Sequence, residues 1–267
     1  MIRRRYDEGV TEIIGFVLIV GLIAVVLFVM ALVVPPMNGA EIEGELALAA
    51  VQGVSDLKYD MDLLWEDGTF PNVTRSVLVQ LSTPAKGVSS LLPVFTPQVG
   101  SATLTAGVSK VTLNVGDKEY DNLLRLVYST SNHYAPDSVV VYDAGAVFAG
   151  TRDVQSLVLA PSVGKAADGS LLVLLPRLSE GGETSVSGNS FGVIEYRLID
   201  EPHVDTYDRP EIKINQGNEA AAKYMAELID NMDLNQGNPW NIDQYPGTVR
   251  VMTVNYSLSV RGAVQWP

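Results

Sequence analysis

The chain has 267 residues, of which 47% are hydrophobic, and its formal net charge at pH 7 is −13. A chain this acidic has too little positive surface to neutralise phosphates, which excludes nucleic acids as partners. It has no cysteine, which excludes disulfides, thiolate catalysis, cysteine-ligated zinc and iron–sulfur clusters.

The N-terminal region joins a short basic stretch to a long apolar run. Three arginines occupy positions 3–5, and no charged residue occurs from Ile13 to Val34. A helix of that length crosses a hydrocarbon core of about 30 Å. Since it has no polar face, a membrane span is favoured over a buried core helix. The basic residues before the span place the N-terminus in the cytoplasm and the chain from Met37 onward outside the cell.

A second helix is expected directly after this span. Pro35 and Pro36 should end the first helix, because proline has no amide donor and clashes with the preceding turn. Residues 41–65 then repeat apolar side chains at helical spacing: Leu46, Ala50, Val54, Leu57, Met61 and Leu64. This pattern predicts an amphipathic helix whose apolar stripe packs against a sheet.

From Ser76 onward the sequence has the pattern of short strands. Runs rich in β-branched residues occur at 76–83, 101–115, 123–131, 138–150, 153–163, 170–178, 190–199 and 248–260. One further helix is predicted at 218–232, which is rich in good helix formers. The expected fold is α+β: an N-terminal hydrophobic transmembrane or assembly helix, then a mainly antiparallel, sandwich-like β ectodomain with one or two amphipathic helices.

Signals for catalysis are poor. The only histidines, His133 and His203, stand isolated in predicted loops, and the sequence contains no recognised nucleophile, metalloprotease or nucleotide-binding motif. We therefore expect a protein that is not an enzyme and has no cofactor. A membrane-tethered hydrolase is the alternative left open.

Two kinds of accessory site are candidates. The acidic stretch 200–211, treated as a loop, carries Asp200, Glu201, Asp205 and Asp208, whose oxygens suit a calcium ion, although clustered acids are usually just a solvated surface. Asn72 and Asn255 each begin an Asn-X-Ser/Thr glycosylation pattern. Asn255 lies within a predicted strand, so Asn72 is the better acceptor.

The opening sequence resembles a known kind of export signal. Asp7-Glu8-Gly9 followed by Val10 and an unbroken apolar helix is similar to class III signal peptides, those of archaeal type IV pilin-like proteins and archaellins. The stretches VVVYDAGAVFAG and SLLVLLPRL also resemble segments of archaeal pilin-like membrane proteins with β-rich ectodomains. The resemblance implies that a prepilin peptidase cuts after Gly9 and that the apolar helix stays as anchor and assembly helix.

Glu12 has two candidate roles, and only the first depends on this resemblance. After cleavage it would be the third residue, where it could neutralise the α-amino group of a neighbouring pilin-like subunit. Alternatively, it is an interfacial carboxylate that favours the start of a helix. Both interpretations stay open at this point.

The expected organisation has four parts: a leader (1–9), a transmembrane or assembly helix (10–36), an amphipathic helix and connection (37–68) and a β-rich extracellular domain (69–267). The expected function is that of an archaeal cell-surface protein and a major or minor subunit of an adhesive or structural filament. Its partners would be the membrane, the prepilin peptidase and other subunits. The alternative is a single-pass surface protein that never polymerises and binds a ligand or envelope partner.

Overall fold

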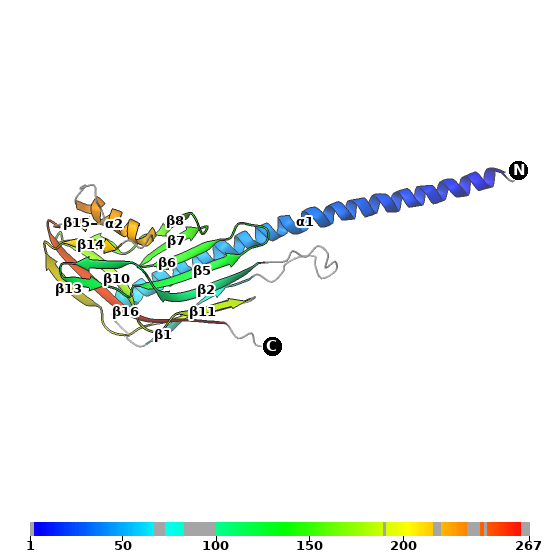
Figure 1. The fold of residues 1–267 in the computed structure, drawn as a ribbon. Coiled ribbons are helices and arrows are strands. Elements are labelled where there is room, and N and C mark those ends of the chain that lie inside the picture. The colour runs from blue at the N-terminus through cyan, green and yellow to red at the C-terminus, as the bar shows by residue number, and fades with distance from the viewer. Residues whose placement is uncertain are drawn as a thin grey trace.

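The protein consists of one long helix and a β-rich head (Figure 1). The computed structural model describes residues 3–66, 73–82, 100–188, 191–215, 220–233, 241–242 and 245–262, with side chains throughout except at 3–12, 66, 230–233 and 241. Helix α1 (Arg3–Glu66) extends from the head, and the N-terminus lies at its free end. The α+β class and the mainly antiparallel sheets agree with the sequence prediction.

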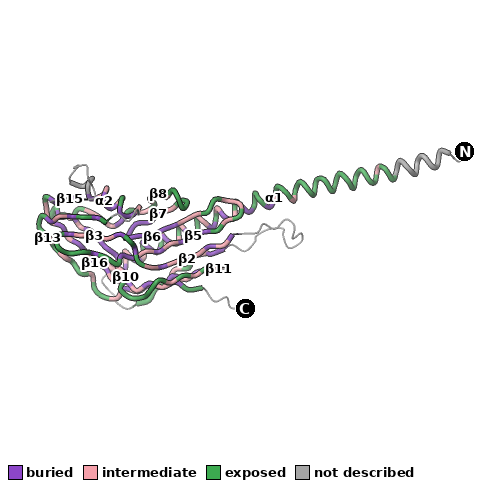
Figure 2. The backbone as a smooth tube through the Cα atoms, in the orientation of Figure 1, coloured by how far each residue is buried: buried purple, intermediate pink, exposed green. Residues whose placement is uncertain are grey.

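The two halves of α1 have opposite surroundings. From Ile13 to Val33 the large apolar side chains are all exposed, whereas the second half enters the head (Figure 2). The predicted stripe is confirmed, because every member is buried: Leu46, Ala50, Val54, Leu57, Met61 and Leu64. The helix therefore has an apolar half that no described part of the head covers and an amphipathic half built into a core.

The predicted helix end at Pro35 and Pro36 is wrong, because α1 continues through both prolines. A proline's fixed φ is compatible with a helix, and its cost of roughly 3 kcal/mol comes from a lost hydrogen bond and a clash one turn earlier. Tertiary contacts offset that cost here. Pro35 is buried, and so are Gly39 and Glu43 on the same side of the helix.

The first sheet, sheet A, is organised around the long strand β16 (Thr248–Gly262). One side of β16 pairs in parallel with β10 (Leu171–Glu180), which in turn pairs with β9 (Val163–Lys165). The first half of β16 also pairs with β13 (His203–Asp208) and its second half with β12 (Phe191–Leu198), both antiparallel. Strand β1 (Thr74–Gln80) completes the sheet beside β12.

Two further sheets are antiparallel throughout. Sheet B has the order β11 (Thr184–Gly188), β2 (Ser101–Val108), β5 (Leu124–Ser131), β6 (Val139–Asp143), β7 (Ala146–Gly150) and β8 (Gln155–Leu159). Sheet C has the order β15 (Asn241–Ile242), β14 (Ile212–Asn215), β3 (Thr112–Val115) and β4 (Lys118–Tyr120). The predicted helix in this half of the chain is α2 (Ala220–Asp233).

The head contains two apolar cores. In the first, the amphipathic half of α1 packs with residues of sheets A and B. Two tyrosines of sheet A hold the helix there: Tyr256 donates to the carbonyl of Met61 at 2.8 Å, and Tyr196 donates to Asp60 at 3.1 Å. In the second core, α2 packs with sheet C and with the β6–β7 hairpin.

Several strands were not predicted, namely β4, β9, β11, β13, β14 and β15. The most consequential is β13, because it turns half of the expected loop at 200–211 into a strand and places His203 in a sheet. Its side chains are exposed or half-buried and mostly polar, so the apolar alternation that identifies a strand is missing. Pairing with β16 determines its conformation.

Candidate functional site

The exposed half of α1 is the first candidate site. Of the residues that the structure describes, α1 alone is a helix long and apolar enough to cross a membrane, and none of its most apolar window is buried in the protein. So large a continuous apolar surface is unfavourable in water. This segment thus has the length and character that a membrane anchor or a signal sequence needs.

The residues of the predicted processing site lie at the start of this helix. Asp7, Glu8, Gly9 and Val10 all have helical backbone, as does Glu12. Their side chains lie outside the described part of the structure. The processing and assembly roles therefore rest on the sequence.

A buried carboxylate joins the head to α1 near the end of the apolar run. Glu43 is fully buried, and its two oxygens accept four hydrogen bonds from backbone amides. The amides of Tyr134 and Ala135 bond to Oε2 at 2.9 and 2.7 Å. The amides of His133 and Gly100 bond to Oε1 at 2.7 and 3.3 Å. The β5–β6 loop (132–138) and the residue before β2 are thereby attached to the helix.

The four amides decide the charge of Glu43. Burial acts to raise its pKa, but the hydrogen bonds from the amides outweigh that effect and lower the pKa below its ordinary value. Each bond stabilises the ionised form and is lost in part on protonation. Glu43 is therefore an anion held by backbone dipoles, with a positioning role between helix and loop.

Sequence reasoning missed this contact, although the sequence contains a signal for it. Glu43 precedes Leu46 by three residues and thus occupies the position where the buried stripe of α1 would continue toward the N-terminus. A charged residue on the apolar face of an amphipathic helix needs a partner. Its partners are backbone amides of residues far along the chain, which no local pattern identifies.

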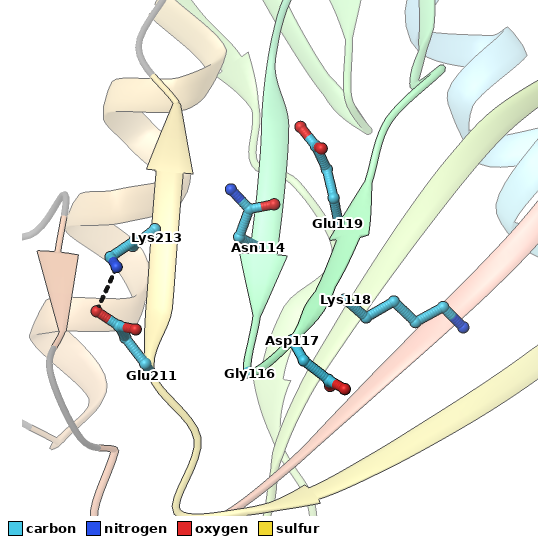
Figure 3. Close-up of a pocket in the computed structure, with 7 residues that line it drawn as sticks. All are labelled: Asn114, Gly116, Asp117, Lys118, Glu119, Glu211 and Lys213. Atoms are coloured by element: carbon cyan, nitrogen blue, oxygen red, sulfur yellow. Dashed lines mark ion pairs between the residues drawn. The ribbon is translucent and has the colours of Figure 1, made fainter.

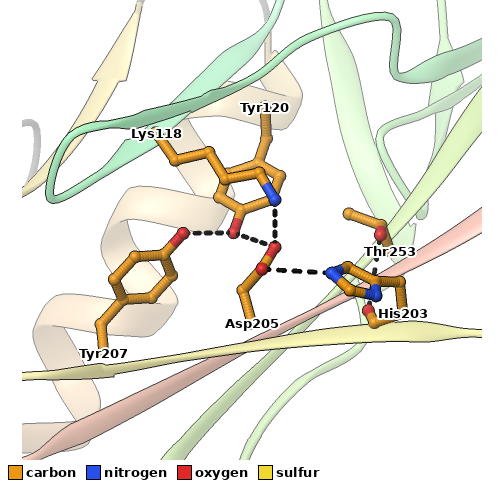
Figure 4. A network of polar contacts seen from close by, with 6 residues as sticks. All are labelled: Lys118, Tyr120, His203, Asp205, Tyr207 and Thr253. Carbon is orange, nitrogen blue, oxygen red and sulfur yellow. Dashed lines mark hydrogen bonds and ion pairs between the residues drawn. The ribbon is translucent and has the colours of Figure 1, made fainter.

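A polar network forms the second candidate site, at the end of the head away from the N-terminus (Figures 2 and 4). Asp205 of β13 is its centre, and the ammonium of Lys118 donates to it at 2.5 Å. The hydroxyl of Tyr120 donates to the same carboxylate at 2.7 Å and lies 2.8 Å from the hydroxyl of Tyr207. His203 contacts the other carboxylate oxygen at 3.2 Å.

The charges in this network favour a structural role. Burial, followed by the hydrogen bonds with Tyr207 and Asp205, raises the pKa of Tyr120 far above its ordinary value. Burial acts to raise the pKa of Asp205, but hydrogen bonds from Lys118 and Tyr120 outweigh it, and the net shift is downward. At neutral pH the phenol keeps its proton and the carboxylate keeps its charge. The network thus fastens the β3–β4 hairpin to β13.

A shallow polar pocket lies next to the network, at the β3–β4 turn (Figure 3). Its volume is about 280 Å³, and it is lined by side chains of β3, β4 and the start of β14. Glu211 and Lys213 form an ion pair at 2.6 Å on one wall, and Lys118 is turned away from them toward the network. Asn114 and Glu119 supply further polar groups. Such a lining could bind a small polar ligand.

The four predicted calcium ligands are not gathered around one point. Among the described residues, no group of three or more His, Asp or Glu side chains is placed to hold a metal ion. Asp205 has the ammonium of Lys118 as its cation, and Asp200 accepts a hydrogen bond from Asn255 at 3.0 Å. Glu201 follows Asp200 in the chain and lies before β13, whereas Asp208 is the last residue of β13.

The two predicted glycosylation sites differ in what the structure says about them. Asn72 lies outside the described residues. Asn255 lies within β16, where its backbone pairs with Arg177 of β10 and its side-chain amide donates to Asp200. A glycan at Asn255 would disrupt that hydrogen bond, which leaves Asn72 as the better candidate.

Comparison with known proteins assigns a family to most of the head. Residues 97–261 match a family model described as "Family of unknown function (DUF7289)", and they make up more than half of the chain. The chain belongs to this family. No curated protein and no solved structure matches it.

The DUF7289 segment begins after α1 and β1 and includes every strand from β2 to β16, apart from Gly262 at the end of β16. The polar network around Asp205, at the end of the head away from the N-terminus (hereafter the tip), lies wholly within this segment. Glu43 lies outside it, whereas its amide partners at Gly100 and in the β5–β6 loop lie inside it. The contact at Glu43 thus joins the family domain to the helix that precedes it.

Proposed function

We propose that this protein is a non-enzymatic, pilin-like cell-surface protein of an archaeon, and a major or minor subunit of a type IV pilus-like filament. The observation that carries the proposal is the division of α1 into an exposed apolar half and a half built into the head. The helix and the head therefore form one continuous unit, and its exposed apolar surface lies on the first half of α1. The role in adhesion or surface structure follows from the resemblance of the first residues to pilin precursors.

No described part of the chain covers the exposed half of α1, so a different environment is needed to bury it. Fully burying one large apolar side chain is worth about 1.5–3 kcal/mol, and many such side chains are exposed between Ile13 and Val33. A bilayer supplies one suitable environment. The apolar halves of neighbouring subunits supply another, which is what a filament core requires.

Processing by a prepilin peptidase would connect the two environments. Cleavage between Gly9 and Val10 removes the three arginines and leaves an apolar N-terminus followed by Glu12. Before assembly the protein would be a single-pass membrane protein with its head outside the cell. After assembly it would lie in an extracellular filament.

The experiment that tests this proposal is the isolation of surface filaments from the source cells, followed by sequencing of their subunits. We expect this chain among them, beginning at Val10. A Gly9→Val variant should accumulate as precursor, because a larger side chain obstructs cleavage at the junction. Native protein that still begins at Met1 would contradict the processing step, and filaments without this chain would contradict the filament role.

A second candidate is a single-pass surface protein that binds a ligand or envelope partner without polymerising. The polar pocket at the tip favours it, since the tip lies farthest from the apolar helix (Figures 1 and 3). Protease added to intact cells with a permeable envelope should digest the head under either function. The two functions differ in one result: a surface protein that does not polymerise would be absent from purified filaments.

A further inference from the structure

The β5–β6 loop is the part of the described head that lies next to the protruding half of α1 (Figure 1). Tyr134 of this loop packs closely on α1. Its aromatic ring lies against Gly39, and a β-carbon at Gly39 would overlap the ring. The four amide bonds to Glu43 fix the same loop one turn further along the helix. The position of the loop along α1 is thus well determined.

The distance from the apolar run to this loop is short. Val34 is the last residue of that run, and Gly39 follows five residues later, or about 7.5 Å along a helix that rises roughly 1.5 Å per residue. A bilayer of about 40–45 Å with a hydrocarbon core of about 30 Å has a headgroup layer of roughly 5–8 Å on each side. If Val34 marks the edge of the core, Tyr134 lies at the level of the headgroups.

The side chains at this level suit such a layer. His133 and Pro136 of the loop are exposed, and Met37 of α1, two residues before Gly39, is 68% exposed. Tyrosine is enriched at membrane interfaces because its ring is apolar and its hydroxyl is polar. Asp137 is the only acidic residue between Asn132 and Ser138, although the chain as a whole carries a net charge of −13. The loop thus carries a single negative charge in an otherwise strongly acidic chain.

We propose that the β5–β6 loop is a lipid-contacting surface of the head, held at headgroup level by Glu43 and Gly39. The head would then sit directly on the bilayer instead of standing away from it on a free stalk. This inference rests on the proposed membrane anchoring of α1 and adds to it a second contact, between lipid headgroups and His133, Tyr134 and Pro136.

The absence of cysteine makes a direct test simple, because one introduced cysteine can be labelled alone. The full chain carrying His133→Cys is labelled with a fluorophore and inserted into phosphatidylcholine vesicles that contain headgroup-spin-labelled lipid, a quencher that acts only at contact. Pro136→Cys is a second loop position in case the first variant folds poorly. Asp117→Cys, exposed on the β3–β4 turn (Figure 3), is the control for a head position in water. Val17→Cys, tested with acyl-chain spin labels, reports on the span.

We expect the loop labels to lose at least half of their fluorescence and the Asp117 label to lose almost none. Loop labels that behave like the Asp117 label, while the Val17 label is quenched by the acyl-chain probe, would overturn the loop contact and leave the anchoring intact. A Val17 label that is not quenched would refute the anchoring itself, and the loop contact with it.

Discussion

The aromatic ring of Tyr134 lies on the α-carbon of Gly39, so the β5–β6 loop touches α1 where the helix has no side chain. One turn later, Glu43 binds the backbone of the same loop. A missing side chain and a buried carboxylate thus cooperate in one contact between helix and head.

The first prediction concerns the space at Gly39. Gly39→Ala should lower the free energy of unfolding by about 1–3 kcal/mol, because its methyl group overlaps the Tyr134 ring and forces it to move. Denaturation of the full chain in detergent micelles measures the change. Gly44→Ala is the matched control: nothing lies within 4 Å of a β-carbon there, so it should stabilise the helix by about 0.5–1 kcal/mol. Equal effects at the two positions would contradict the contact.

The second prediction concerns the charge of Glu43. Glu43→Gln keeps the shape but removes the charge and sets an amide group against backbone donors, so the free energy of unfolding should fall by on the order of 2–4 kcal/mol. Hydrogen exchange at the amides of His133, Tyr134 and Ala135 should become faster. Glu45→Gln, at an exposed position of the same helix, should change neither quantity. Unchanged exchange in the Glu43 variant would show that the loop is held by other contacts.

The third prediction is a pH dependence with a defined sign. The pKa of Glu43 is lower in the folded protein than in the unfolded chain, where a glutamate has a pKa of about 4.3. Its stabilisation is therefore complete above that value and is lost as the pH falls through the folded pKa. The difference in unfolding free energy between wild type and Glu43→Gln should be constant from about pH 6 to 8 and shrink in acid. A difference that grows in acid would contradict the downward shift.

The fourth prediction concerns the tip network. Tyr120→Phe removes a buried hydroxyl that bonds to Asp205 and contacts the hydroxyl of Tyr207, so it should lower the free energy of unfolding by about 1–2 kcal/mol. Tyr59→Phe, at a position 65% exposed on α1, is the control and should change stability by less than about 0.5 kcal/mol. If both variants were equally stable, the network would contribute nothing to the head.

The fifth prediction distinguishes the two roles of Glu12. If Glu12 neutralises the α-amino group of a neighbouring subunit, Glu12→Gln should leave processing and membrane insertion intact while reducing the yield of filaments, because a buried amine would lose its counter-charge. The yield is measured from sheared cells against wild type. A normal yield would leave Glu12 as an interfacial residue at the helix start, worth about 0.3–1 kcal/mol there.

Local patterns identified the parts of the fold whose burial follows a simple period. The stripe from Leu46 to Leu64 was predicted residue by residue, since a helix that packs on one side must repeat its apolar residues at that spacing. Most strands of sheets A and B were found for the same reason, with the period of a strand. Strand β13 was not, because it is a polar strand whose partner β16 lies some 45 residues later in the chain.

The sequence by itself determined that an apolar helix precedes an acidic, cysteine-free, β-rich domain, because hydropathy, charge and residue type are local properties. Only the tertiary structure decided that α1 passes through Pro35 and Pro36 without ending, since Pro35 is buried where the helix enters the head. It likewise decided the partners of Glu43 and Asp205. The amides that bind Glu43 lie 57–92 residues away in the chain, and Lys118 and Tyr120 lie 87 and 85 residues from Asp205; only folding brings such groups within hydrogen-bonding distance.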